Sequence, residues 1–195
     1  MSTRRSRGPL GLLCSLLPPA LWWPVAPVQA VAQTFTVLYT FGSVNYANGS
    51  GPTGTLAMDG NGVLYGVTAQ GGAYRGCFEG EGVGCGTVYS LTPPTSPGGG
   101  WTEEVLWNFG ASASDGSAPN EVIMGPHGVL YGTATWGGQS EGGGCCGAVF
   151  SLTPPSTPGG AWTEAIVWAA PAGGGAVYPS GLVIGGKGEL STERI

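Results

Sequence analysis

The sequence predicts an all-β protein built from tandem four-stranded antiparallel units, two complete and a third in part, in a partial β-propeller-like array. Three observations lead to this prediction. The stretch Gly-Val-Leu-Tyr-Gly at 62–66 returns unchanged at 128–132. The chain holds 39 glycines and 16 prolines, which divide it into short apolar runs of strand length. Beyond the first 32 residues, these runs lack the apolar spacing of a helix and are rich in β-branched and aromatic residues.

The first 32 residues have the order of a secretory signal peptide. Arginines at positions 4, 5 and 7 precede an apolar run, which is followed by Ala-Val-Ala at 30–32. Prolines interrupt the apolar run and leave it short for a membrane-spanning helix. We therefore expect cleavage after Ala32, export of a mature chain that begins at Gln33, and a location outside the cell or in its envelope.

The first repeat unit is assigned to residues 33–100. Asp-Gly-Asn-Gly at 59–62 favours the tight turn of a hairpin, and Pro93 ends the last strand because proline cannot donate to the sheet. Strands are expected at 34–41, 54–58, 63–69 and 86–92.

The second unit, residues 101–161, repeats this order with a strand at 101–109, a hairpin at 121–136 that turns at 126–128, and a strand at 147–153. The third unit, 162–195, is expected to be incomplete. After residue 190 the repeat calls for a tyrosine, but the chain has Ser191, which we interpret as a truncated or frame-shifted end.

The strands at 105–107 and 166–168 are apolar on both alternating faces. A strand covered on one side only would show a polar face, so we expect the units to pack face to face. Gly66 and Gly132 lie inside strands, where we expect a neighbouring ring or backbone to approach closely.

These blocks, W-T-E-x-V-L-W-x-F, D-G-S-x-P, G-V-L-Y-G-T and G-x-V-F-S-L-T-P-P, resemble the tandem repeat of bacterial secreted proteins called choice-of-anchor tandem repeat GloVer-containing proteins, the Gloeo/Verruco repeat. The resemblance covers about residues 34–190. It implies an extracellular or envelope-attached repeat protein with a propeller-like fold, but it implies no specific biochemical activity.

Four cysteines remain after the leader, and in an exported protein an even number favours disulfides. A bond between Cys77 and Cys85 would close a short loop. Cys145 and Cys146 could form a vicinal bond, pair elsewhere or stay reduced. The chain has no paired Cys-x-x-Cys motif and one histidine, so neither a metal nor another cofactor is predicted.

No catalytic residues are predicted. His127, the sole histidine, is expected to be an exposed turn residue rather than a catalytic base, so neither a Ser-His-Asp nor a Cys-His nucleophile is expected. Glu103 and Glu104 are adjacent in a strand and therefore point to opposite faces. The remaining acids are interpreted as solvated loop residues: Asp59, Glu79, Glu81, Asp115 and Glu141.

Four aromatic residues in or beside loops form a candidate binding rim for an extracellular glycan or protein, although they could instead cap the apolar ends of the units. They are Tyr46, Tyr74, Trp136 and Tyr178. The mature chain carries three basic and eleven acidic residues, which argues against nucleic acid and anionic membranes as partners. Self-association through unpaired sheet edges is also expected.

The function expected from these observations is that of an exported structural or binding protein without catalysis. The alternative is a fragment of an extracellular, propeller-type carbohydrate-active hydrolase or lyase, with its catalytic acids in units outside these residues.

Overall fold

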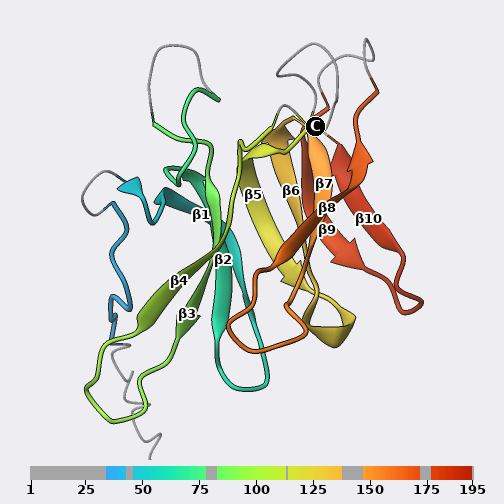
Figure 1. Ribbon diagram of the computed structural model, residues 1–195. Helices are drawn as coiled ribbons and strands as arrows, with labels where there is room; N and C mark the ends of the chain where they lie inside the picture. Colours follow the sequence, from blue (N-terminus) through green and yellow to red (C-terminus); the bar gives the residue numbers. More distant parts are fainter. Residues whose placement is uncertain are drawn as a thin grey trace, which may run out of the picture. The chain divides into compact units, whose positions relative to one another are not determined.

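The structure is a computed structural model that describes residues 34–42, 46–77, 83–112, 114–137, 147–171 and 177–194. The chain divides into two compact units, Met1–Phe35 and Thr36–Ile195. All the strands belong to the second unit, and every pairing among them is antiparallel. The prediction of an all-β fold with four-stranded antiparallel sheets is confirmed (Figure 1).

Three sheets follow one another along the chain. The first contains β1 (Ser50–Met58), β2 (Leu64–Gln70), β3 (Thr87–Thr92) and β4 (Thr102–Asn108) in that order. The second contains β5 (Ser117–Met124), β6 (Leu130–Trp136), β7 (Ala148–Thr153) and β8 (Thr163–Ala169), also in chain order. The third is a pair formed by β9 (Pro179–Ile184) and β10 (Leu190–Arg194).

The sheets are one strand out of phase with the sequence repeat. β4 and β8 open the second and third repeat units, yet each is the last strand of the sheet before it. The predicted unit boundaries at 101 and 162 therefore lie within sheets, between a third and a fourth strand. The cause is local, because β3 and β4 are joined by a short connection and antiparallel neighbours in sequence usually pair.

The strand predicted at 34–41 is wrong, since residues 34–42 form no strand. This segment matches β4 and β8, which pair with the strand that precedes them in the chain. Residues 34–42 pair with no strand in the structure, so this extended segment lacks the ladder that β4 and β8 join. Val37 and Leu38 are accordingly 62% and 39% exposed, whereas Leu106, the counterpart of Leu38, is 9% exposed.

The predicted hairpin turns are present, and the same turn occurs in all three sheets. In each turn a backbone N–H donates to the carbonyl four residues later, which closes the hairpin. In the second sheet the turn includes a short 3-10 segment, η2 (Pro126–Gly128), with His127 at φ 59°. The three bonds run from Asp59 to Val63, from Gly125 to Val129 and from Gly185 to Glu189.

The two four-stranded sheets pack against each other, as the repeat pattern predicts. The rings of Phe109 and Phe150 meet edge to face with centroids 5.0 Å apart, and both side chains are fully buried. Burial of a side chain of this size stabilises the fold by about 1.5–3 kcal/mol. The cluster between the sheets contains Val67, Cys85, Val88, Leu106 and Phe109 from the first and Val122, Leu130, Ala134, Phe150 and Leu152 from the second.

The prediction that 166–168 is covered on both faces is wrong. Val167 in β8 is 48% exposed, whereas its counterpart in β4, Leu106, is buried against the second sheet. The face of β8 that carries Val167 is turned toward the two-stranded third sheet, which leaves this side chain half exposed.

Candidate functional site

A groove of about 590 Å³ lies where the first sheet meets the second. β4 contributes an indole, the connection from β4 to β5 contributes hydroxyls and a carboxylate, and β8 contributes a second carboxylate. Its lining residues are Trp107, Ala111, Ser112, Ser114, Asp115, Glu164, Ala165 and Ile166.

Asp115 is held firmly at one side of this groove. Its Oδ2 accepts hydrogen bonds from the backbone N–H groups of Gly110 (2.9 Å) and Ala111 (3.1 Å), and its Oδ1 accepts one from Trp107 Nε1 (3.4 Å). The residue is only 8% exposed, so its interpretation as a solvated loop acid is wrong. Burial raises the pKa of the Asp115 carboxyl, and the hydrogen bonds from Ala111, Trp107 and Gly110 oppose that rise.

Glu164 faces the groove from the start of β8, paired in register with Leu152. Its Oε1 is buried and finds no hydrogen-bond partner among the described residues. Burial is the larger cause and repulsion from Asp115 the smaller one, and together they raise the pKa of Glu164 to about 7. At neutral pH this carboxyl is therefore present in both protonation states, so it can donate or accept a hydrogen bond.

A related group of side chains lies at the other face of the first sheet. The Tyr39 hydroxyl donates to Glu103 Oε2 (3.3 Å) and accepts from Asn48 Nδ2 (2.7 Å). Glu103 Oε1 is also buried without a partner among the described residues, and burial raises the pKa of this carboxyl too.

The repeat relates these two groups position by position. Tyr39 and Trp107 each stand two residues before a phenylalanine, Asn48 and Asp115 each open a stretch of type x-G-S-x-P, and Glu103 and Glu164 each follow a Thr. The phenylalanines also match, since Phe41 packs on Tyr89 at 4.5 Å between ring centroids as Phe109 packs on Phe150. Residues 36–42 thus cover the first sheet as β4 covers the second.

The two copies differ in ways that make the second the candidate site. In the first copy a tyrosine hydroxyl contacts the glutamate and a neutral asparagine replaces the aspartate. In the second copy the indole donates to Asp115, and both carboxyls line an open groove. Sequence reasoning missed Glu164 altogether, although its equivalence with Glu103 in the repeat was a usable signal.

The structure brings together two of the four residues of the predicted rim. Trp136, the last residue of β6, and Tyr178, just before β9, meet edge to face with centroids 5.3 Å apart. Tyr46 and Tyr74 are 49% and 43% exposed, and no ring contact of the described residues joins them to that pair. All four lie at the end of the sheets where β2 and β6 finish.

Cys77 and Cys85 form a disulfide with a Cα–Cα distance of 5.3 Å. Cys85 is fully buried in the core, so the bond ties the loop before β3 to the packed sheets. Cys145 and Cys146 lie outside the described residues, as do Glu79, Glu81 and Glu141.

His127 is exposed in its turn, as predicted. In the described part of the chain, no group of three or more His, Cys, Asp or Glu side chains could hold a metal ion. Nor do these residues include a helix long and apolar enough to cross a membrane.

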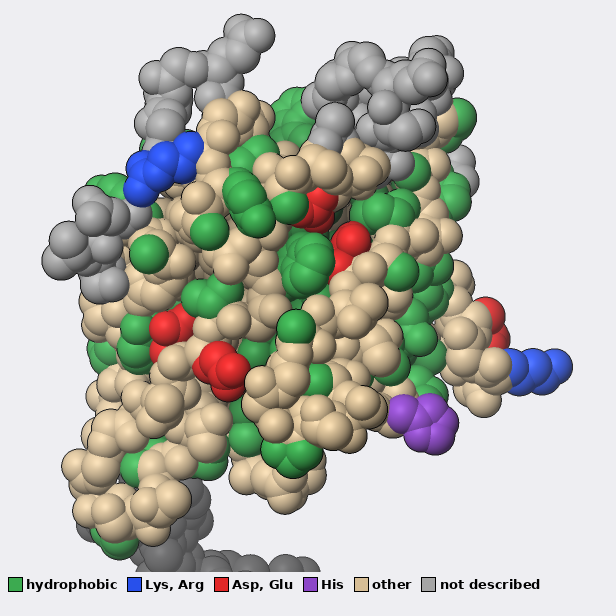
Figure 2. Space-filling model, viewed as in Figure 1, with side chains coloured by type: hydrophobic (Ala, Val, Ile, Leu, Met, Phe, Trp, Pro, Cys, Tyr) green, Lys and Arg blue, Asp and Glu red, His purple; other side chains and the backbone are tan. Residues whose placement is uncertain are grey.

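On the face shown in Figure 2, acidic side chains appear in small separate groups among hydrophobic and uncharged ones, and basic side chains lie at the margins. Comparisons with known proteins add no further constraint on the site: no protein-family model matches this sequence, and no curated protein matches it significantly.

Proposed function

We propose that this is an exported repeat protein of the GloVer type, a partial propeller that acts as a binding module, and that the groove between its first two sheets binds a neutral extracellular glycan. The observation that carries the proposal is the Glu164 carboxyl, which lines an open groove with one buried oxygen that lacks a hydrogen-bond partner among the described residues. The carboxyl therefore keeps hydrogen-bonding capacity that its described neighbours do not use, and a ligand in the groove can engage the part of it that lines the groove.

The other groups in the groove also suit a sugar. A saccharide offers hydroxyl groups that donate and accept, together with apolar ring faces. The hydroxyls of Ser112 and Ser114 and the carboxyl of Asp115 lie beside the apolar surfaces of Trp107 and Ile166. Two carboxyls in an acidic chain repel phosphate, sulfate and uronate groups, which favours a neutral glycan.

Export is supported by two independent features. The leader has the charge and hydropathy order of a signal peptide. The disulfide between Cys77 and Cys85 fits an extracellular location, because such bonds persist in oxidising compartments.

A second candidate function is favoured by one observation. A glutamate whose pKa is raised to about 7, next to a second carboxyl, is the kind of pair that supplies the acid and the base of glycoside hydrolysis. Under this alternative the groove would cleave the glycan that it binds, as in a carbohydrate-active hydrolase.

The experiment is a calorimetric titration of the mature protein with cellohexaose, laminarihexaose and mannohexaose, combined with an assay for newly formed reducing ends. We expect binding of at least one hexasaccharide without cleavage, and about tenfold weaker binding after Glu164→Gln. Glu104→Gln, an exposed glutamate on β4, is the matched control and should bind like the wild type.

Each other outcome has a definite meaning. Reducing ends that appear with the wild type and disappear with Glu164→Gln would establish the hydrolase instead. Absence of binding to all three sugars, or equal binding by Glu164→Gln, would refute the proposed groove.

A further inference from the structure

The disulfide between Cys77 and Cys85 lies against the loop that forms one wall of the groove. Both sulfur atoms lie beside Gly110, the second residue after β4. A Cβ atom on Gly110 would be 2.9 Å from Cys77 Sγ and closer still to Cys85 Sγ, so the sulfurs fill the space where a side chain would stand. Gly110 also has a φ of 94°, a backbone conformation that favours glycine. The disulfide therefore confines the backbone at this position.

The same glycine holds one of the two carboxyls of the groove. The Gly110 N–H donates to Asp115 Oδ2 at 2.9 Å, and the next N–H, that of Ala111, donates to the same oxygen at 3.1 Å. Asp115 is only 8% exposed, so these two bonds fix its carboxyl in the groove wall. A single residue thus links the disulfide to a side chain that lines the groove.

Both ends of this loop are also tied to the buried half of the disulfide. The Phe109 N–H donates to the Gly86 carbonyl at 3.1 Å, and the Ala118 N–H donates to the Cys85 carbonyl at 2.9 Å. Cys85 is fully buried in the core between the first two sheets. The covalent bond joins Cys77, from the loop after β2, to this anchor.

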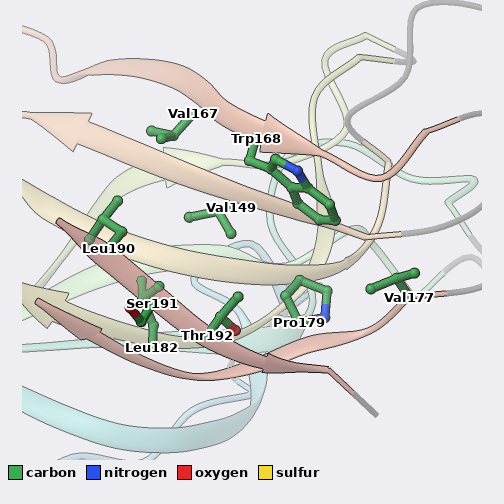
Figure 3. Close-up of a pocket in the computed structure, with 9 residues that line it drawn as sticks. All are labelled: Val149, Val167, Trp168, Val177, Pro179, Leu182, Leu190, Ser191 and Thr192. Carbon is green, nitrogen blue, oxygen red and sulfur yellow. The ribbon is translucent and has the colours of Figure 1, made fainter.

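The next unit of the repeat lacks the arrangement. Pro171 takes the place of Gly110 and has no N–H to donate, and a glycine replaces Asp115 in the stretch that ends at Pro179. A cleft of about 380 Å³ lies there between the second and third sheets, where Trp168 again supplies an indole. No acidic side chain is among the residues that line this cleft (Figure 3). The combination of disulfide, glycine and carboxyl is therefore particular to the groove between the first two sheets.

We propose that the Cys77–Cys85 disulfide is a positioning element of the binding groove, because it confines Gly110 and thereby holds Asp115 in place for the ligand. The inference rests on the proposed function, since it makes Asp115 one of the groups that contact the glycan. Without the bond, no covalent link keeps the Cys77 sulfur against Gly110, and glycine has more backbone freedom than any other residue. A ligand would then have to order the loop as it binds, which lowers the affinity.

The first test is a calorimetric titration with the hexasaccharide that the wild type binds. Cys77→Ala/Cys85→Ala and Asp115→Ala should each bind about tenfold more weakly than the wild type. The combined variant should also bind only about tenfold more weakly, because the disulfide acts through Asp115 and the two losses do not add. Tyr39→Phe, which removes hydrogen bonds at the other face of the first sheet, controls for lost stability and should bind like the wild type.

The second test needs no ligand. Amide hydrogen exchange followed by NMR reports whether the Gly110 and Ala111 N–H groups still hold Asp115. Both should exchange about tenfold faster in Cys77→Ala/Cys85→Ala than in Tyr39→Phe, because local opening of the loop becomes easier. Far-UV circular dichroism verifies that both variants are folded under the conditions used.

The outcomes separate this inference from the proposed function. The positioning role is wrong, while the groove stands, if either the cysteine variant or Asp115→Ala binds like the wild type, or if the combined variant binds about a hundredfold more weakly. If the wild type binds no hexasaccharide, the proposed function fails and the exchange rates decide. Equal rates at Gly110 and Ala111 in the two variants would then overturn the positioning role as well, and faster rates in the cysteine variant would support it for another ligand.

Discussion

The ring of Tyr89 lies directly against Gly66 on the neighbouring strand, so closely that a Cβ atom on Gly66 would be 2.6 Å from Tyr89 Cζ. Phe150 and Gly132 repeat this relationship in the second sheet, again as directly opposed residues. The ring can lie here only because glycine has no Cβ atom, since the ring fills the space that a Cβ atom would occupy. Each four-stranded sheet therefore contains one aromatic residue that covers one glycine.

Gly132→Ala should destabilise the protein by about 1–3 kcal/mol, because the new methyl group forces the fully buried Phe150 ring out of its place. The measurement is urea unfolding followed by tryptophan fluorescence. Gly60→Ala is the matched control, since a Cβ atom there meets nothing within 4 Å. Equal effects of the two substitutions would contradict this account of the glycines.

Tyr39→Phe should lower the free energy of unfolding by about 1–2 kcal/mol, because it removes a hydroxyl that bonds both Asn48 and Glu103. Tyr74→Phe, which alters an exposed tyrosine, should have little effect on the same urea curve. If Tyr39→Phe left the urea unfolding curve unchanged, the contacts of residues 36–42 with the first sheet would not contribute to the stability of the protein.

The stability of the protein should fall between about pH 5 and pH 8, with Glu164 as one cause. The folded-state pKa of Glu164, about 7, lies above the ordinary value of 4.5, so the folded protein binds this proton more tightly than the unfolded chain. The resulting stabilisation is complete below the unfolded pKa and is lost as the pH rises through the folded pKa.

Glu164→Gln should therefore gain on the order of 1–2 kcal/mol relative to the wild type at pH 8, allowing for partial solvent screening, and little at pH 4.5. Urea midpoints at the two pH values measure this difference, with Glu104→Gln as the exposed control. A constant difference between variant and wild type at both pH values would rule out the buried carboxyl as its source.

The double variant Cys77→Ala/Cys85→Ala should lose about 2–3 kcal/mol of stability, the chain-entropy value for a cross-link over this sequence separation of 8 residues. Both cysteines are changed together so that no thiol remains to pair with Cys145 or Cys146. Thermal unfolding under non-reducing conditions gives the measurement. An unchanged melting temperature would show that the disulfide does not contribute to the stability of the protein.

The sequence alone was sufficient for the strand content, the hairpin turns and the close approach at Gly66 and Gly132. These features are local, because each depends on alternation, turn residues or the absence of a side chain. The segment at 34–41 shows the limit of such reasoning. It has the composition of β4, but a strand also needs a neighbour, which composition does not reveal.

The candidate site was harder to predict than the fold. Asp115 and Glu164 are 49 positions apart in the sequence, and they share a groove only because the connection after β4 folds back beside β8. The strand at which each sheet ends was equally hard to predict. A sequence repeat gives the length of the repeating unit, but it does not show which strand is the last one of a sheet. The duplicated arrangement also depends on the fold, because Tyr39, Asn48 and Glu103 come together only in three dimensions.

The offset of one strand between repeat and sheet affects how a protease would act on this protein. The connection between β3 and β4, at 93–101, is largely exposed, and loops of this kind are where nicking concentrates. A cut there would separate the first repeat unit from the second in the covalent chain. The two fragments would nevertheless stay together, because the ladder from Thr87 opposite Asn108 to Thr92 opposite Thr102 spans the break.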